Sequence, residues 1–354
     1  MSINPVNKVI VKDLSIVIVN YRCWEKLSAC LGSLDKMTGT SFRFEVIVVD
    51  NDSGDSKLPE FRILYPRFSF IPNFGNYGFA NGCNLGSTIA NGKYLLFLNP
   101  DTIVTEKALS SMLDQARVSK ANSIVSCRQF TENGKEDKPY GVFPSPLSMT
   151  GWSRALAKLF KVNFTPAQND RFLYPEWVSG SVIMISKSSF NRIGGWNERF
   201  WMYSEDIDFC HKAREAGGQI YLLKNTSVIH SHGGSSRSSI EISALTKTEV
   251  SISKHEYVSI HEKGFRQLFM QTFLVLNNLL SGILPAFLGL IFFFNKKLAI
   301  STLIYGRVAQ YYINALIQDT WMSPRSVKYQ FTKQSINVPE RKLMPVFRSK
   351  DHRA

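Results

Sequence analysis

Residues 14–19, LSIVIV, form an uninterrupted apolar run rich in β-branched side chains. A strand that is apolar at every position is typical of a parallel strand covered on both faces. A helical pattern follows over 24–34, and strand and helix patterns then recur over 44–49, 78–90, 94–98 and 106–119. This alternation predicts an α/β fold with an open, mainly parallel sheet that is flanked by helices and joined by right-handed crossovers.

Polar residues follow three of the predicted strands, as Asn20-Tyr21, Asp50-Asn51 and Asn99-Pro100-Asp101. Ligands of open α/β sheets bind outside the carboxyl ends of the strands, so these groups predict a site at one edge. Carboxylates at two such ends would suit a hard cation that bridges a diphosphate. An ordinary turn or cap role for each aspartate remains an equal alternative.

Residues 76–86, NYGFANGCNLG, place small residues at the start of the predicted helix 78–90. Such a helix start could approach phosphate or sugar closely, or could pack tightly against the sheet. The chain has no G-x-G-x-x-G motif, which counts against a dinucleotide oxidoreductase. Between 139 and 175, five prolines and few regular patterns predict a long irregular insertion of the lid or binding-loop kind.

After the insertion, the patterns predict a strand over 181–185 and helices over 187–193 and 204–216. Ser204 can cap the last helix, and helix polarity favours acids such as Glu205 and Asp206 in its first turn. A rigidly held carboxylate there could also accept a proton from a substrate hydroxyl. His230 ends an apolar run, where it could ligate a metal or be structural, and Gly233 to Ser236 could close over a phosphate.

The net charge of +14 points to anionic partners. Residues 267–295 carry no charge. A segment of this length could cross a bilayer, lie in it, or form a buried core helix. Eight Lys and Arg residues follow between 325 and 353. They could form an arm that lies on anionic headgroups, or a solvated tail. Cations beside apolar sequence favour an anionic membrane surface and argue against nucleic acid.

The five cysteines contain no C-x-x-C pair and fit a reducing compartment. The first thirteen residues lack the apolar segment of a secretory signal, so we expect the N-terminus in the cytoplasm.

Taken in order, seven segments resemble the inverting glycosyltransferases of family 2, especially their rhamnosyltransferase-like branch. The resemblance covers about 14–236 and is carried by SIVIVNY, VIVVDNDSGD, NYGFANGCNLG, YLLFLNPD, VSGSVIMIS, FNRIGGWNERFWMYSEDIDFCHKAREAG and VIHSHGGSS. It implies a GT-A fold over this stretch. The uncharged segment and the basic residues after it add a C-terminal helical, membrane-associating region and a basic tail. The expected boundaries are an extension over 1–13, a transferase domain over 14–240 divided at 127/128, a helical region over 241–320 and a basic tail over 321–354.

The resemblance also implies the roles of site residues. Asp206 matches the general base, within the pair it forms with Glu205. Asp101 and His230 match ligands of Mg²⁺ or Mn²⁺, with His232 a poorer fit than His230. The implied donor-binding set is Val19, Asn20, Tyr21, Asp50, Asn51, Asn76, Gly78, Asn84, Asn99 and Asp101, and the implied acceptor-side set is Trp177, Gly180, Trp201 and Arg214.

Three positions depart from the family pattern, namely Asn197, Lys187 and the pair His211-Lys212. They concern packing or secondary contacts and do not indicate inactivity. The chain contains no Arg-Trp dipeptide, so the Q-x-x-R-W element of processive synthases is absent and addition of a single sugar is expected.

The activity implied by the resemblance is metal-dependent transfer of one sugar, with inversion, from a nucleotide diphosphate donor to an acceptor hydroxyl. The uncharged segment and the basic tail favour a lipid-linked glycan as that acceptor. Rhamnose from dTDP-rhamnose is the expected donor sugar. The expected setting is bacterial cell-surface polysaccharide synthesis of the O-antigen kind, at the cytoplasmic face of the inner membrane. A non-catalytic module that binds nucleotide sugars or scaffolds a membrane assembly is the main alternative. A nucleotidyltransferase would require glycines that VNYRCWEK lacks, and the oligomeric state stays open.

Overall fold

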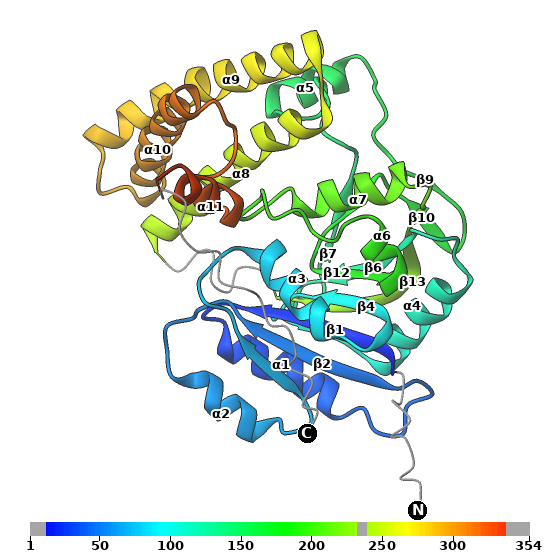
Figure 1. Ribbon diagram of the computed structural model, residues 1–354. Coiled ribbons are helices and arrows are strands. Elements are labelled where there is room, and N and C mark those ends of the chain that lie inside the picture. Colours follow the sequence, from blue (N-terminus) through cyan, green and yellow to red (C-terminus); the bar gives the residue numbers. More distant parts are fainter. Residues whose placement is uncertain (1–11, 232–238, 338–354) are drawn as a thin grey trace, which may run out of the picture.

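The computed structural model describes residues 12–231 and 239–337. Figure 1 shows a sheet flanked by helices, with a group of C-terminal helices at one end of it. His232, the glycine loop after it and the tail beyond 337 lie outside the described residues.

The first half of the chain has the predicted alternation of strands and helices. Its elements are β1 (Lys12–Asn20), α1 (Trp24–Asp35), β2 (Phe44–Asp50), α2 (Lys57–Leu64), β3 (Ser69–Pro72), α3 (Phe79–Ile89), β4 (Gly92–Leu98), β5 (Thr102–Ile103), α4 (Glu106–Val118) and β6 (Ile124–Phe130). The sequence patterns did not predict α2, β3 or β6. α2 has only one buried side chain, so it carries little apolar periodicity.

The second half adds a reversed strand and the helices that complete the fold. Its elements are β7 (Glu136–Asp137), β8 (Tyr140–Gly141), α5 (Gly151–Leu159), β9 (Ala167–Gln168), β10 (Phe172–Tyr174), β11 (Trp177–Val178), β12 (Val182–Ser186), α6 (Lys187–Arg192), α7 (Glu205–Glu215) and β13 (Ile220–His230), followed by α8 (Ile240–His261), α9 (Gly264–Ile291), α10 (Lys296–Gln318) and α11 (Val327–Asn337).

The main sheet has the order β3-β2-β1-β4-β12-β6-β13-β10-β9. Strands β3, β2, β1 and β4 are parallel, with Asn20 opposite Asp50 at their carboxyl ends. Strand β12 is antiparallel to β4 and pairs Val182 with Leu98. Because of this reversal, the beginning of β12 meets the end of β4, which brings the segment before Val182 to the predicted ligand-binding edge.

Both faces of the sheet are covered, as the run at 14–19 predicted. Ile16 and Ile18 belong to the apolar core beneath α1 and α4. Val17 and Val19 point to the opposite core, which contains Trp196 and Phe209. Successive side chains of a strand alternate between faces, so a fully apolar strand is what a two-sided core requires.

The expectation of an irregular stretch over 139–175 is wrong in part, because this region contains α5 and three short strands. Thr150 accepts a hydrogen bond from the Ser153 amide at 3.1 Å, and the Ser153 hydroxyl bonds back to the Thr150 amide. This reciprocal cap satisfies amides that the first helical turn leaves without partners. β9 and β10 then extend the sheet beyond β13.

The C-terminal helices pack against one another beside the sheet, and α9 is long and apolar enough to cross a membrane. Only 17% of its most apolar window is buried, so α9 is not the buried core helix that the sequence left open. Gly282 lies against Tyr305 and Gly289 against Thr302, which bring α9 and α10 close together. Thr302 Oγ1 donates a 2.9 Å hydrogen bond to the Ala286 carbonyl across this contact.

Candidate active site

The ends of β1 and β2 carry a buried polar cluster. Asn20 Nδ2 donates to Asp50 Oδ1 at 3.2 Å, and the Ser53 hydroxyl donates to the same oxygen at 2.5 Å. Asn20 Oδ1 accepts from the Cys23 amide at 3.3 Å, which joins the cluster to the start of α1. The two strand ends therefore form one rigid wall, with Tyr21 half-buried beside it.

The loop before α3 is held by side-chain amides. Asn51 Nδ2 donates to Asn76 Oδ1 at 2.9 Å and to the Gly78 carbonyl at 3.2 Å. Gly78 has φ +90°, and a Cβ there would lie 2.0 Å from the Trp201 carbonyl oxygen. Trp201 Nε1 in turn donates to the Asn76 carbonyl at 2.9 Å. Close backbone approach, which only glycine permits here, thus joins the start of α3 to the segment that precedes α7.

Asp101, Asn99 and His230 meet at the carboxyl end of β4. His230 Nε2 lies 3.1 Å from Asp101 Oδ1 and 3.4 Å from Asn99 Nδ2. His230 Nδ1 lies 2.8 Å from Gln129 Oε1. If Nδ1 donates to this carbonyl oxygen, neutral His230 presents the lone pair of Nε2 to Asp101. Nε2 can then accept from the Asn99 amide at 3.4 Å, and a proton or a cation can lie between Nε2 and Asp101 Oδ1.

Asp206 lies on the first turn of α7 and is held by backbone amides. Its Oδ2 accepts from the Gly180 amide at 3.0 Å, and its Oδ1 accepts from the Ile207 amide at 2.9 Å. Burial raises the pKa of the Asp206 carboxyl, and these amide hydrogen bonds oppose the rise. The half-buried carboxylate is fixed in orientation, as a general base requires.

A short chain of contacts connects Asp206 to the Asp101 group. Gly180, which binds Asp206, is followed by Ser181, whose carbonyl accepts from the Asn99 amide at 2.9 Å. The Ser181 hydroxyl also lies 3.0 Å from Gln129 Oε1, the atom that faces His230. The structure thus brings Asp101, Asp206 and His230 to the same edge of the sheet.

Glu205 differs from its neighbour in being buried. Its Oε2 has no hydrogen-bond partner among the described residues. Burial, with a smaller contribution from the charge of Asp206, raises the pKa of Glu205 to about 8. Asp206 is therefore the more accessible acid of the pair.

Several expected site residues have structural contacts instead. The Asn84 amide bonds the Trp196 backbone and Glu198, so both of its polar atoms are engaged, and its contact with the donor stays a prediction. Val19 is 7% exposed and Trp201 is 6% exposed, so each lies under the site with little open surface.

Two residues of the implied acceptor-side set, Arg214 and Trp177, have contacts with residues other than the acids. Arg214 is eight residues beyond Asp206, about 12 Å along the helix, and lies over the Phe143 ring. Trp177 donates to the Val142 carbonyl at 2.8 Å in the small β8–β11 sheet. Of the acceptor-side set, Gly180 is the residue that directly contacts Asp206.

Three residues of the site were not indicated by the sequence patterns, namely Ser53, Gln129 and Ser181. Gln129 sits near the end of β6, so the rule about strand ends would have found it had that strand been predicted. Ser53 and Ser181 lie near strand termini in ordinary turn sequence. No local pattern distinguishes them from other loop serines.

Comparison with known proteins agrees with this geometry. Residues 15–193 match the family model described as Glycosyl transferase family 2. Residues 164–232 match a second model, described as the N-terminal domain of galactosyltransferase.

Three relatives carry transferase names. The low-salt glycan biosynthesis hexosyltransferase Agl10 of Haloferax volcanii is 29% identical over 229 residues, which are 64% of this chain and 69% of the relative. The N-acetylglucosaminyl-diphospho-decaprenol L-rhamnosyltransferase of Mycobacterium tuberculosis is 25% identical over 240 residues, covering 61% and 75% of the two chains. The rhamnosyltransferase WbbL of Escherichia coli is 24% identical over 204 residues, covering 56% and 76%.

A crystal structure of GalNAc-T7 with UDP, GalNAc and Mn²⁺ has a TM-score of 0.50 and 15% identity to this chain. The match covers 70% of this chain and 50% of that structure, and this likeness concerns the fold, which is of the expected GT-A type. With a family match that spans just over half of its residues, and with the predicted acids gathered at the edge of a GT-A sheet, this chain belongs to glycosyl transferase family 2 and is a glycosyltransferase.

Proposed function

We propose that this glycosyltransferase moves one sugar from a nucleotide diphosphate to a hydroxyl of a lipid-linked glycan, with inversion at the anomeric carbon. The observation that carries the proposal is the Asp206 carboxylate, which two backbone amides hold beside the group formed by Asn99, Asp101 and His230. In this proposal residues 14–240 form the transferase domain and residues 241–320 hold it at the membrane.

The reaction is a direct displacement. The acceptor oxygen bonds to the anomeric carbon, and the bond from that carbon to the diphosphate oxygen breaks. Asp206 takes the proton of the attacking hydroxyl, and the nucleoside diphosphate leaves with the electron pair. A positioned base of this kind contributes roughly 10² to 10⁴-fold in rate, and the fixed orientation of both substrates contributes further.

The Asp101 group fits a divalent cation. Asp101 Oδ1 and His230 Nε2 face each other at 3.1 Å, and Gln129 Oε1 lies against the other ring nitrogen, as second-shell acceptors do for metal-bound histidines. Asp101 and His230 would hold Mg²⁺ or Mn²⁺, with Asn99 as a hydrogen-bond donor. Such an ion would stabilise the negative charge that grows on the leaving diphosphate.

The donor wall is formed by Asn20, Asp50 and the Asn76–Gly78 loop in this proposal. Rhamnose from dTDP-rhamnose is our first choice of donor, because two of the relatives are named as rhamnosyltransferases. A decaprenol-linked acceptor appears in the name of one of them. The exposed apolar helix α9 suits an enzyme that meets a lipid-linked acceptor at a membrane surface, and we place that surface on the cytoplasmic side.

The test is Asp206→Asn in the full chain, assayed with a panel of nucleotide sugars that includes dTDP-rhamnose and with Mn²⁺ or Mg²⁺. We expect transfer to fall by 10² to 10⁴-fold while donor affinity stays within a few-fold, because asparagine keeps the shape of the side chain and loses the basic oxygen. Glu215→Gln, on the same helix and exposed, is the matched control and should keep parental activity. Full turnover by Asp206→Asn would reject Asp206 as the base.

A further inference from the structure

Helix α5 presents an apolar face to the surroundings. Trp152 is 75% exposed, Leu159 76% and Phe160 69%, and Leu156 is exposed between them. The spacing of these four residues places them on one side of the helix. Ser153 and Ala157 are buried, so the small residues face the protein and the large apolar ones face away from it. We call Trp152, Leu156, Leu159 and Phe160 the α5 patch.

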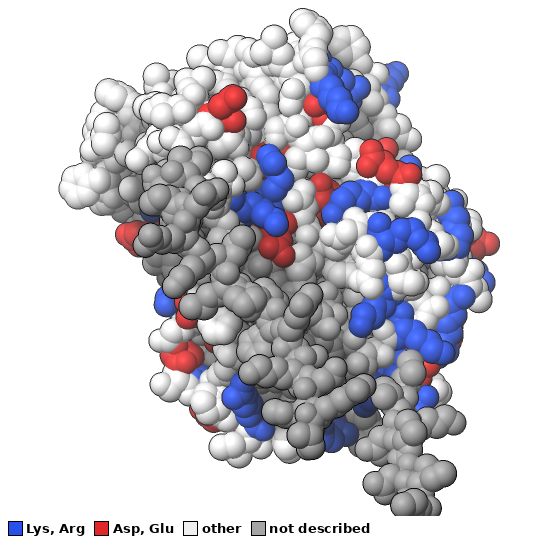
Figure 2. Space-filling view, viewed as in Figure 1, with Lys and Arg blue, Asp and Glu red and all other residues white. Residues whose placement is uncertain are grey.

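A second side of the same helix is basic. Arg154 and Lys158 on α5, and Lys161 just after it, line a hollow that Val162, Asn163 and Phe164 close from the following chain. In Figure 2, Lys and Arg lie over the α5 end of an upper region that otherwise has few charges. A helix with Trp and Leu on one side and Lys and Arg on another is typical of a helix that lies in the plane of a membrane interface.

Helix α5 is fixed beside the junction of α8 and α9. Met149, just before α5, packs with Val258 and with Met270 and Leu274 of α9. Lys254 Nζ donates to the Met149 carbonyl at 3.0 Å. The first turns of α9 at this junction expose further apolar side chains, namely Phe265, Leu268 and Phe269. Figure 1 shows α5 next to this end of α9, where the exposed apolar side chains of α9 begin.

We propose that α5 is an in-plane membrane anchor, whose apolar patch enters the acyl boundary of an anionic bilayer while Arg154, Lys158 and Lys161 bind lipid headgroups. The charge of the basic side selects an anionic lipid surface as the occupant, and the packing of Met149 against Met270 and Leu274 places α5 beside the exposed apolar helix α9. The inference rests on the proposed function only in that the acceptor is presented by a membrane.

This anchor would orient the acceptor side of the enzyme. The segment that leads into α5 is tied to β11, because Trp177 Nε1 donates to the Val142 carbonyl at 2.8 Å and Phe143 stacks on His211 of α7. Three residues beyond Trp177, Gly180 binds Asp206. Binding of α5 to the bilayer would therefore hold the helix that carries the base at a fixed height above the lipid-linked substrate.

The experiment measures flotation of the full chain with vesicles of phosphatidylcholine alone or with 30% phosphatidylglycerol. We expect Trp152→Ser/Leu159→Ser to reduce the partition coefficient at least tenfold on the anionic vesicles. The matched control is Ile63→Ser/Val118→Ser, which removes two apolar side chains of the same exposure, 80% and 79%, from α2 and α4, and it should stay within twofold of the parent. Lys158→Glu/Lys161→Glu should weaken binding to anionic vesicles at least tenfold and binding to neutral vesicles less than twofold.

Partition of Trp152→Ser/Leu159→Ser equal to that of the parent would overturn the proposal. So would a loss of self-association in that variant without a change in partition, since a second copy of the chain would then be the occupant. Release of nucleoside diphosphate from the donor in the absence of vesicles should be the same in parent and variant. A parent that binds vesicles through α5 but never consumes a donor would refute the proposed function and leave the anchor intact.

Discussion

At the scale of single residues, Asp101 and His230 show how two ordinary side chains become a candidate ligand pair. Both lie in segments that resemble the family, YLLFLNPD and VIHSHGGSS, but they are 129 residues apart in the chain. Their atoms come within 3.1 Å because β5 pairs with the end of β13, where His230 lies opposite Thr102. The pairing of strand ends, more than the residue types, makes a cation site available.

Asp101→Ala should weaken donor binding and the response to Mn²⁺ by about 10²-fold, because it removes the carboxylate that the proposed ion requires. Titration of donor affinity against Mn²⁺ concentration measures the effect. Asp114→Ala, which removes an exposed carboxylate on α4, is the control. An unchanged Mn²⁺ dependence in Asp101→Ala would exclude Asp101 as a ligand.

Because of the buried Glu205 carboxyl, we expect the stability of the protein to depend on pH. Its pKa rises from 4.5 to about 8 on folding, so the folded chain holds a proton that the unfolded chain releases. The contribution of Glu205 to the free energy of unfolding is fully present below about pH 4.5 and is lost as the pH rises toward 8. Glu205→Gln should match the parent at pH 5 and exceed it at pH 8.5 by an amount on the order of a few kcal/mol.

Urea unfolding of Glu205→Gln and parent at the two pH values measures this difference. The exposed Glu60→Gln on α2 serves as the reference, because its carboxyl is not buried and should give the same small effect at both values. A difference between Glu205→Gln and parent that does not change with pH would mean that Glu205 does not titrate in this range.

At the scale of elements, the start of α3 depends on a single backbone contact. Gly78 has φ +90°, and a Cβ added at this residue would lie 2.0 Å from the Trp201 carbonyl oxygen. Both the dihedral angle and the space therefore exclude a side chain. This contact ties α3 to the loop before α7, which itself contains two left-handed residues, Tyr203 and Ser204. Backbone strain of this kind is retained where surrounding structure over-determines it.

Gly78→Ala should therefore lower the free energy of unfolding by more than about 3 kcal/mol, the sum of a left-handed alanine and a clash with backbone. Gly134→Ala is matched in dihedral angle at φ +73° but has open space around its Cβ, and it should cost only about 1 kcal/mol. Chemical denaturation compares the two. Equal costs would show that the contact with Trp201 has no energetic weight.

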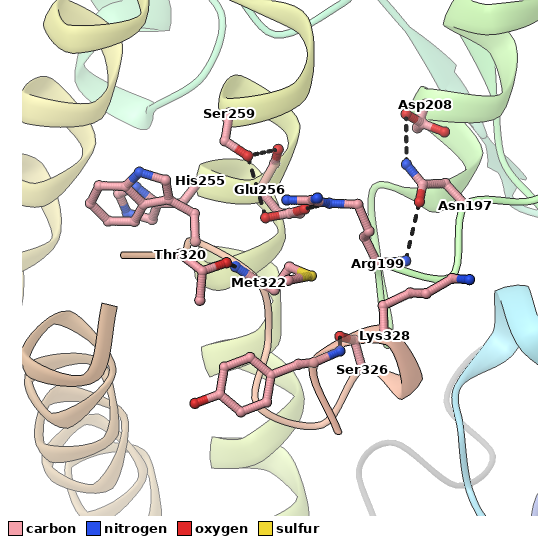
Figure 3. A network of polar contacts seen from close by, with 12 residues as sticks. Asn197, Arg199, Asp208, His255, Glu256, Ser259, Thr320, Met322, Ser326 and Lys328 are labelled. Atoms are coloured by element: carbon pink, nitrogen blue, oxygen red, sulfur yellow. Dashed lines mark hydrogen bonds and ion pairs between the residues drawn. The ribbon is translucent and has the colours of Figure 1, made fainter. Parts of the chain in front are cut away.

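At the scale of the whole molecule, an ion pair with a buried carboxylate joins the sheet domain to the C-terminal helices. Figure 3 shows Arg199, from the loop before α7, bonded to Glu256 of α8. The Glu256 side chain is only 1% exposed, and burial raises its pKa while Arg199 opposes the rise. The pair therefore links the loop beside the acids to the helical part that carries the proposed membrane surface.

Arg199→Ala leaves Glu256 without its cation and should cost about 1–3 kcal/mol of stability at pH 8. The raised pKa of Glu256 lets it take up a proton as the pH falls, so the cost should shrink toward pH 5. Thermal unfolding of the parent and Arg199→Ala at pH 8 and pH 5 measures this loss of stability. The double variant Arg199→Ala/Glu256→Gln is the control. The double variant should recover part of the loss at pH 8, and failure to recover any would assign the loss to packing of the arginine stem.

The sequence by itself determined the layered α/β fold, because apolar runs and helical spacing are local and dictate which faces are buried. It also determined that Asn20, Asp50 and Asp101 stand at strand ends, because position along a strand is local as well. Only the tertiary structure decided which distant groups meet. Gly180 reaches Asp206 because β12 runs antiparallel to β4, and Gln129 reaches His230 because β6 and β13 are neighbours. The order of strands arises from packing of the whole chain, which no short segment encodes.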